Sequence, residues 1–98
     1  MSIVHKPAPK DIQDFGTTSV FQLRVVLIPE ENGYSALARD LPGVASQGDT
    51  IEEAMENIRE ACIGAIEVYK NDGVPIPWTP DHVDAPPEAS QRWILVNA

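Results

Sequence analysis

The chain has 98 residues and a mass of 10.7 kDa, which is enough for one domain with a thin hydrophobic core. Fifteen acidic against seven basic side chains give a formal net charge of −8, so the chain offers no basic stripe for the phosphates of nucleic acid or for an anionic membrane. A single cysteine excludes an internal disulfide, and no apolar run reaches the ~20 residues that cross a bilayer. These bounds predict one acidic, cytoplasmic domain that binds neither nucleic acid directly nor a membrane.

The N-terminal segment shows no sustained helical or strand period, and it contains two prolines and a Gly-Thr-Thr run. We therefore predict an N-terminal arm over residues 1–18 and a single domain over residues 19–98. The arm can be flexible, docked on the domain, or swapped as a strand onto a neighbouring subunit.

A β-hairpin is predicted at the start of the domain. Residues 20–28 are rich in β-branched and aromatic side chains, the Asn32–Gly33 pair suits a tight turn, and residues 34–41 form the return strand. The Pro-Gly pair at 42–43 ends this strand, and residues 44–47 are long enough for a short third strand.

The clearest element is a helix that begins after Thr50. The Thr50 hydroxyl can accept a hydrogen bond from a backbone N–H, and Glu53 can reach back to the Thr50 amide, which makes a capping box. Apolar side chains then recur at the spacing of one helical face until Gly73 ends the helix. Six acids against two bases give this helix a strongly negative outer face.

A proline-rich connection over residues 74–87 follows the helix and holds one large aromatic, Trp78. Trp78 can dock in a proline-binding domain or anchor its own loop on the core, and we predict the anchor. A last strand at residues 92–96 returns to the sheet edge. The predicted fold is therefore α+β, with the order β-β-β-α-β and an antiparallel sheet that has one long helix on one face.

The second face of this sheet needs a cover, because one helix shields only one face. The strand at residues 20–28 has large apolar side chains on both faces, and leaving them in water is costly. We therefore predict a homo-oligomer, either a dimer or a tetramer and most economically a two-fold dimer. The residues predicted for its interface are Val26, Ile28, Tyr34 and Ala36.

Three segments, in this order, resemble the HicB antitoxin family. They are the hairpin over residues 25–34, the run Asp40-Leu41-Pro42-Gly43, and Gln47-Gly48-Asp49-Thr50-Ile51-Glu52-Glu53-Ala54 at the helix start. The resemblance covers about residues 21–78 and implies a degenerate RNase-H-like domain that binds and neutralises a small basic RNase toxin, HicA. Many members of the family also carry a C-terminal DNA-binding module. This chain ends directly after the expected last strand, so it resembles a short member without that module.

Acidic side chains supply the expected contact with a basic toxin, because opposite charge raises the association rate and a carboxylate can occupy the positions of RNA phosphates. The acids predicted for this contact, near the hairpin and on the helix, are Glu30, Glu31, Asp40, Glu52, Glu56 and Glu60. Acids of this kind also keep small domains soluble. The alternative function is a stand-alone, homo-oligomeric structural or ligand-sensing domain with no toxin partner.

Candidate catalytic groups are scattered. A nuclease of the RNase H type needs several carboxylates that converge on two metal ions. The acids that such a site would draw on are Asp40, Glu56, Glu60, Asp81 and Asp84, and the first strand supplies none. His5 and His82 have no local partner to orient them, and Cys62 lies on the apolar face of the helix. We predict no enzyme activity, no catalytic or metal-binding residue, and no cofactor.

Overall fold

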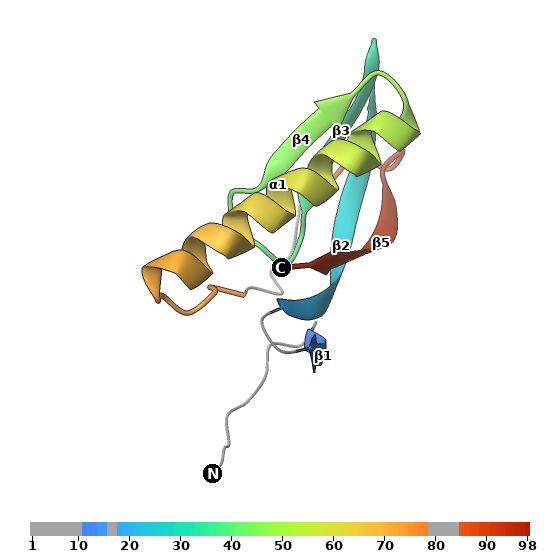
Figure 1. Ribbon diagram of the computed structural model, residues 1–98. Helices are drawn as coiled ribbons and strands as arrows, with labels where there is room; N and C mark the ends of the chain where they lie inside the picture. Colours follow the sequence, from blue (N-terminus) through green and yellow to red (C-terminus); the bar gives the residue numbers. More distant parts are fainter. Residues whose placement is uncertain (1–10, 16–17, 79–84) are drawn as a thin grey trace.

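The computed structural model describes residues 11–15, 18–78 and 85–98. Its elements are β1 (Asp11–Phe15), β2 (Thr18–Glu30), β3 (Gly33–Ala38), β4 (Ala45–Gly48), α1 (Ile51–Asp72) and β5 (Ser90–Asn97). The strands form one antiparallel sheet, and α1 lies across one face of it (Figure 1). The predicted α+β class and the order β-β-β-α-β are confirmed from β2 onward. Within the described part of the chain, no helix is both long and apolar enough to cross a membrane.

Strand β2 organises the sheet, because β1, β3 and β5 all pair with it. Residues Val20 and Phe21 pair with both β1 and β5, and residues 25–27 pair with both β3 and β5. Strands β1 and β3 therefore follow each other along one side of β2, and β5 occupies the other side. Strand β4 extends the sheet from β3, so among the described strands β1, β4 and β5 each pair with one neighbour and leave an edge open.

Strand β1 lies inside the segment for which the sequence predicted an arm. It pairs with β2 of the same chain, and its register is irregular between Asp11 and Gln13. The segment has too few large apolar residues for a strand pattern, so backbone pairing of this kind leaves no signal in the sequence. Residues 1–10 and 16–17 lie outside the described residues, and the division into an arm and a domain stays a prediction.

The core lies between α1 and one face of the sheet. Phe21, Leu23, Val25 and Leu27 alternate along β2 and point toward the helix. The residues of α1 that meet them, spaced four apart, are Ala54, Ile58, Cys62 and Ile66. Each fully buried Leu, Ile or Val contributes about 1.5–3 kcal/mol, so this layer supplies most of the stability of a small domain. Trp78 packs on this core with its ring centroid 5.3 Å from that of Phe21, which confirms the predicted loop anchor.

The start of α1 differs from the predicted capping box in one detail. The Thr50 hydroxyl oxygen accepts a hydrogen bond from the Glu53 backbone N–H at 3.1 Å, as expected. The Glu53 carboxylate, however, accepts from the backbone N–H of Asp49 at 2.6 Å rather than from that of Thr50. The helix ends at Gly73, whose φ of 69° is left-handed, as predicted.

Strand β4 passes unusually close to the start of α1. A Cβ atom added at Gly48 would lie 2.4 Å from the backbone nitrogen of Ala54 and 2.8 Å from the carbonyl carbon of Glu53. Both neighbours are backbone atoms, which cannot turn aside as a flexible side chain can. The glycine at this position therefore sets the distance between the strand and the helix.

We expect Gly48→Ala to lower the free energy of unfolding by about 1–3 kcal/mol, because the added methyl group overpacks a fixed contact. Gly64→Ala is the matched control: it lies inside α1, and its added Cβ would meet nothing within 4 Å. We expect that variant to gain about 0.5–1 kcal/mol, since alanine is the better helix former. Urea unfolding of both variants measures the two values. A Gly48→Ala variant as stable as wild type would contradict the close-packing argument.

Candidate partner-binding surface

The outward side of α1 carries a row of carboxylates. Glu52, Glu56 and Glu60 are all exposed, and their four-residue spacing places them on one face of the helix. Glu52 gains from the positive end of the helix dipole, but like charges four residues apart cost about 0.2–0.5 kcal/mol per pair. The row therefore gives the helix a negative surface at some cost to the helix itself. That these residues contact a partner stays a prediction.

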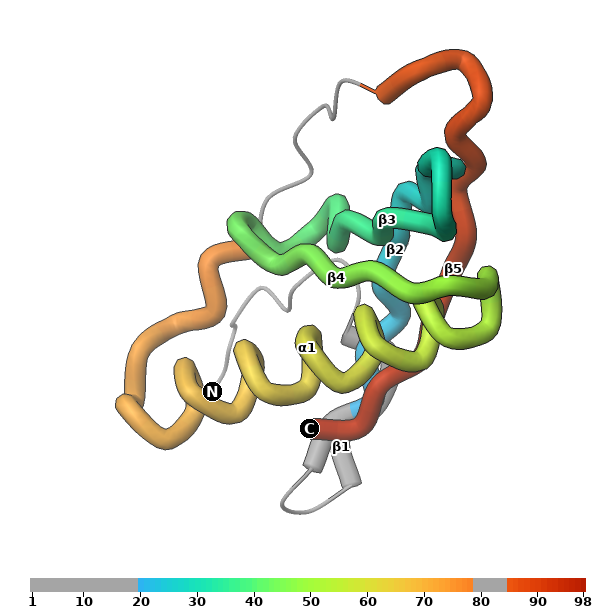
Figure 2. The backbone as a smooth tube through the Cα atoms, turned by 90° about the horizontal axis from the view of Figure 1, so that it is seen from above, coloured from blue at the N-terminus to red at the C-terminus, as the bar shows by residue number. Residues whose placement is uncertain are grey.

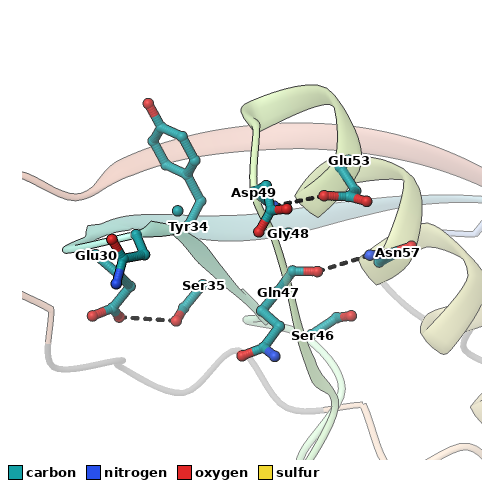
Figure 3. A pocket seen from close by; sticks show the side chains of 11 residues that line it. Glu30, Tyr34, Ser35, Ser46, Gln47, Gly48, Asp49, Glu53 and Asn57 are labelled. Atoms are coloured by element: carbon teal, nitrogen blue, oxygen red, sulfur yellow. Dashed lines mark hydrogen bonds between the residues drawn. The ribbon is translucent and has the colours of Figure 1, made fainter.

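A hollow of about 540 Å³ lies between the tip of the β2–β3 hairpin, β4 and the start of α1 (Figure 3). Three carboxylates line it: Glu30, Asp49 and Glu53. Two of the three already accept internal hydrogen bonds, Glu30 from the Ser35 hydroxyl at 2.8 Å and Glu53 from the Asp49 amide at 2.6 Å. With these oxygens, the hollow offers acceptors and negative charge that suit an ammonium or guanidinium group.

One amide side chain that lines this hollow, that of Asn57, was not singled out in the sequence. The Asn57 side chain donates from its amide nitrogen to the Gln47 carbonyl oxygen at 2.8 Å, which ties α1 to β4 beside the hollow. A polar side chain on the second turn of a helix carries no pattern that would reveal such a contact. Glu31, which was predicted to contact a partner, is exposed at the hairpin tip beside the hollow.

Asp40 lies in a different environment from the other predicted contact residues. Only 2% of it is exposed, and its carboxylate is bound by Arg24. The Arg24 backbone N–H donates to Oδ2 of Asp40 at 2.8 Å, and the guanidinium donates from Nη2 to Oδ1 at 2.6 Å. The hydrogen bond with Asp40 raises the pKa of Arg24. Asp40 thus holds the fold where β3 ends, and it is not a surface acid.

The four residues predicted for an oligomer interface divide between two faces. The register pairs Val26 with Leu37 and Ile28 with Ser35. Val26 and Ile28 therefore lie on the face away from α1, together with the two residues of β3 that they pair with. Ala36 is fully buried in the core on the helix side, and Tyr34 packs against that core. The assignment of all four to one face is therefore corrected: strand pairing depends on register, and the sequence does not reveal the register. Whether Val26 and Ile28 lie in an interface stays a prediction.

The residues that carry the exposed apolar surface of the sheet are Trp93 and Leu95 on β5, each 52% exposed. They pair with Arg24 and Gln22, which places them on the face away from α1. The sequence analysis predicted this strand but not these two residues, because Trp93–Val96 is a continuous apolar run with no alternation to assign its faces.

The candidate catalytic groups do not come together in the described residues. Among these residues, no group of three or more His, Cys, Asp or Glu side chains is placed to hold a metal ion. His5, His82, Asp81 and Asp84 lie outside the described part of the chain. Cys62 is fully buried, and its burial raises the pKa of the thiol to about 12, with a smaller contribution from the nearby charge of Asp40. A thiol that keeps its proton in this way is a poor nucleophile.

Comparison with known proteins identifies the relatives of this chain. The family model of the HicB-like antitoxins of bacterial toxin–antitoxin systems matches residues 24–97. Antitoxin HicB 1 of Photorhabdus laumondii is 38% identical over 73 residues, which cover 70% of this chain and 47% of that protein. Antitoxin HicB of Escherichia coli K12 is 33% identical over 81 residues, which cover 76% of this chain and 59% of that protein. This chain therefore spans only 47% to 59% of the length of these relatives.

A solved structure shares the fold as well. The crystal structure of the N-terminal domain of Burkholderia pseudomallei antitoxin HicB matches with a TM-score of 0.60 and 28% sequence identity, over 76% of this chain and 95% of that one. The chain is thus an α+β domain of the same type as the N-terminal domain of HicB. It belongs to the HicB-like antitoxin family of bacterial toxin–antitoxin systems, as its sequence motifs predicted.

Proposed function

We propose that this chain is an antitoxin that binds a small basic toxin of the HicA-like RNase kind in the cytoplasm and neutralises it by contact, without catalysis. Membership of the antitoxin family supports a toxin as the kind of partner. The observation that carries the proposal furthest is the row of exposed carboxylates Glu52, Glu56 and Glu60 on one face of α1.

The charge distribution supports a cationic partner. The chain has a net charge of −8, and the exposed acids lie mainly on α1 and at the hairpin tip, where Glu30 and Glu31 are. Such a surface steers a basic protein into contact and repels nucleic acid. A protein that cuts RNA must present cationic groups to the phosphates, and carboxylates that occupy those groups block the substrate. Inhibition in this scheme requires no chemistry from the antitoxin.

A charge-reversal variant tests the proposal. We expect Glu56→Lys/Glu60→Lys to bind a HicA-like toxin at least about tenfold more weakly than wild type does, equivalent to about 1.4 kcal/mol. Both positions are exposed on the helix. Isothermal titration calorimetry with the purified toxin, at about 0.1 M and about 1 M NaCl, measures the change, and wild-type binding should weaken as salt shortens the screening length from about 10 Å to about 3 Å.

Asp72→Lys/Glu88→Lys is the matched control for this experiment. It changes the net charge by the same amount at two exposed positions, one at the end of α1 and one in the turn before β5. We expect it to bind almost as tightly as wild type. Equal losses in the two variants would show that only the overall charge matters, and no binding of wild type at either salt concentration would contradict the proposed function.

A further inference from the structure

Strands β4 and β5 form two of the edges of the sheet, and they differ in length. Strand β4 has four residues, and the carbonyl oxygen of Gln47 at that edge is capped by the Asn57 side chain. Strand β5 has eight residues and pairs only with β2 among the described strands. Figure 2 shows β4 running alongside α1, whereas β5 lies across β2 from β3. Long unprotected edges are the ones that pair with another chain.

The free backbone groups of β5 can be assigned from the pairing of β2. The N–H of Arg24 points to Asp40, and its carbonyl oxygen accepts from the Arg39 N–H, so both groups face away from β5. Trp93, opposite Arg24, therefore turns its own N–H and carbonyl group outward, since the two residues form a non-hydrogen-bonded pair. Leu95 follows the same alternation, and its outward carbonyl oxygen accepts from the Arg59 guanidinium at 2.6 Å.

The side chains of β5 include few of the usual devices that block edge pairing. The strand contains no proline and no acid, and Arg92 is its one charged residue. The two residues whose backbone groups are turned toward the open edge, Trp93 and Leu95, are also both 52% exposed. In a chain with a net charge of −8, pairing through a strand without acids sets no carboxylate of that strand opposite another.

We infer that β5 pairs antiparallel with β5 of a second copy about a two-fold axis at Ile94, which joins the two sheets into one. This register sets Trp93 opposite Leu95 of the second copy and Gln91 opposite Asn97, so each apolar or amide side chain meets one of its own kind. Each of these pairs exchanges two backbone hydrogen bonds. Arg92 faces Val96 of the second copy, so the two arginines are not opposed. The pairing does not depend on the proposed toxin contact on α1.

Two features oppose this pairing, and the second gives the dimer a recognisable dependence on salt. Arg59 must release the Leu95 carbonyl oxygen before a second strand can bind there. Each copy also brings a charge of −8, so salt should strengthen the dimer, whereas it should weaken the binding of a basic toxin. The two interactions are therefore distinguished by the sign of their salt dependence.

The test is the oligomeric state of the full chain, measured by sedimentation equilibrium at about 0.1 M and about 1 M NaCl. We expect a mass of twice 10.7 kDa for wild type, with a smaller dissociation constant at high salt. Trp93→Lys/Leu95→Lys should raise the dissociation constant about 100-fold or more, because few residues carry most of the binding energy of an interface. Val68→Lys/Val74→Lys, at positions 57% and 50% exposed, is the matched control and should dimerise like wild type.

Hydrogen exchange of wild type provides a second measurement that does not depend on the folding of the variants. We expect the outward amides of Trp93 and Leu95 to exchange freely in dilute solution and to become protected as the protein concentration rises. A wild-type chain that stays at 10.7 kDa at both salt concentrations would overturn the inference. So would a dimer that the Val68/Val74 variant disrupts and the Trp93/Leu95 variant does not.

Discussion

Replacing Asp40 by alanine is expected to lower the free energy of unfolding by about 3 kcal/mol. The change leaves the Arg24 guanidinium, 17% exposed, without its carboxylate and the Arg24 backbone N–H without its acceptor. Removing one partner of a buried ion pair costs about 3–5 kcal/mol, and the partial exposure of Arg24 favours the lower end of that range. Urea unfolding at neutral pH measures the loss.

Two further variants separate the parts of this effect. Asp40→Asn keeps an acceptor for the Arg24 N–H while it removes the charge, so we expect a smaller loss than for alanine. The double variant Arg24→Met/Asp40→Ala removes the stranded cation, so its loss should be less than the sum of the two single losses. Asp49→Ala, at an exposed acid near the start of α1, should change stability by well under 1 kcal/mol. An Asp40→Ala variant within about 1 kcal/mol of wild type would contradict the role assigned to the pair.

This role explains a limit of prediction from the sequence. Asp40 belongs to the Asp-Leu-Pro-Gly run by which the chain resembles its family, and the sequence predicted it as a contact for a toxin. Its burial depends on where β3 ends relative to β2, and a stretch of alternating residues does not fix that point. The motif therefore identified the family. That Asp40 binds Arg24 inside the fold became clear only from the hydrogen bonds.

Elements with a strong local cause were predictable. Both ends of α1 are set by local signals, namely Thr50 at the N-cap and Gly73 at the C-cap. The spacing of its apolar residues sets which face is buried. The exposure of Glu52, Glu56 and Glu60 follows directly from the same helical period. Helix period and caps suffice to place a row of acids on a surface.

Features that depend on how one strand pairs with another were not predictable. The sequence did not reveal which face Tyr34 and Ala36 share, that Trp93 and Leu95 are exposed on β5, or that β1 pairs with β2. Each of these depends on register or on backbone hydrogen bonds, which place no constraint on side-chain composition. The hollow beside the hairpin has the same origin, because it depends on where β4 lies against the start of α1.

The buried thiol of Cys62 should make the chain lose stability in alkaline solution. The folded chain raises the pKa of this thiol to about 12, whereas a thiol in the unfolded chain loses its proton near 9. Above pH 9 the unfolded state therefore releases a proton that the folded state keeps, and the free energy of unfolding falls by about 1.4 kcal/mol per pH unit. The stabilisation is complete below pH 9 and is lost as the pH approaches 12.

Comparison with Cys62→Ala isolates this contribution, because the two proteins differ only at the thiol. At pH 7 we expect the variant to be about 1 kcal/mol less stable, since it loses the packing of the sulfur in the core. At pH 10 the wild type alone has lost about 1.4 kcal/mol, so the difference should vanish or reverse. Urea unfolding of the two proteins at both pH values decides the matter. A difference that stays constant from pH 7 to pH 10 would mean that the thiol titrates in the folded chain as it does in water, and that water reaches the core between α1 and β2.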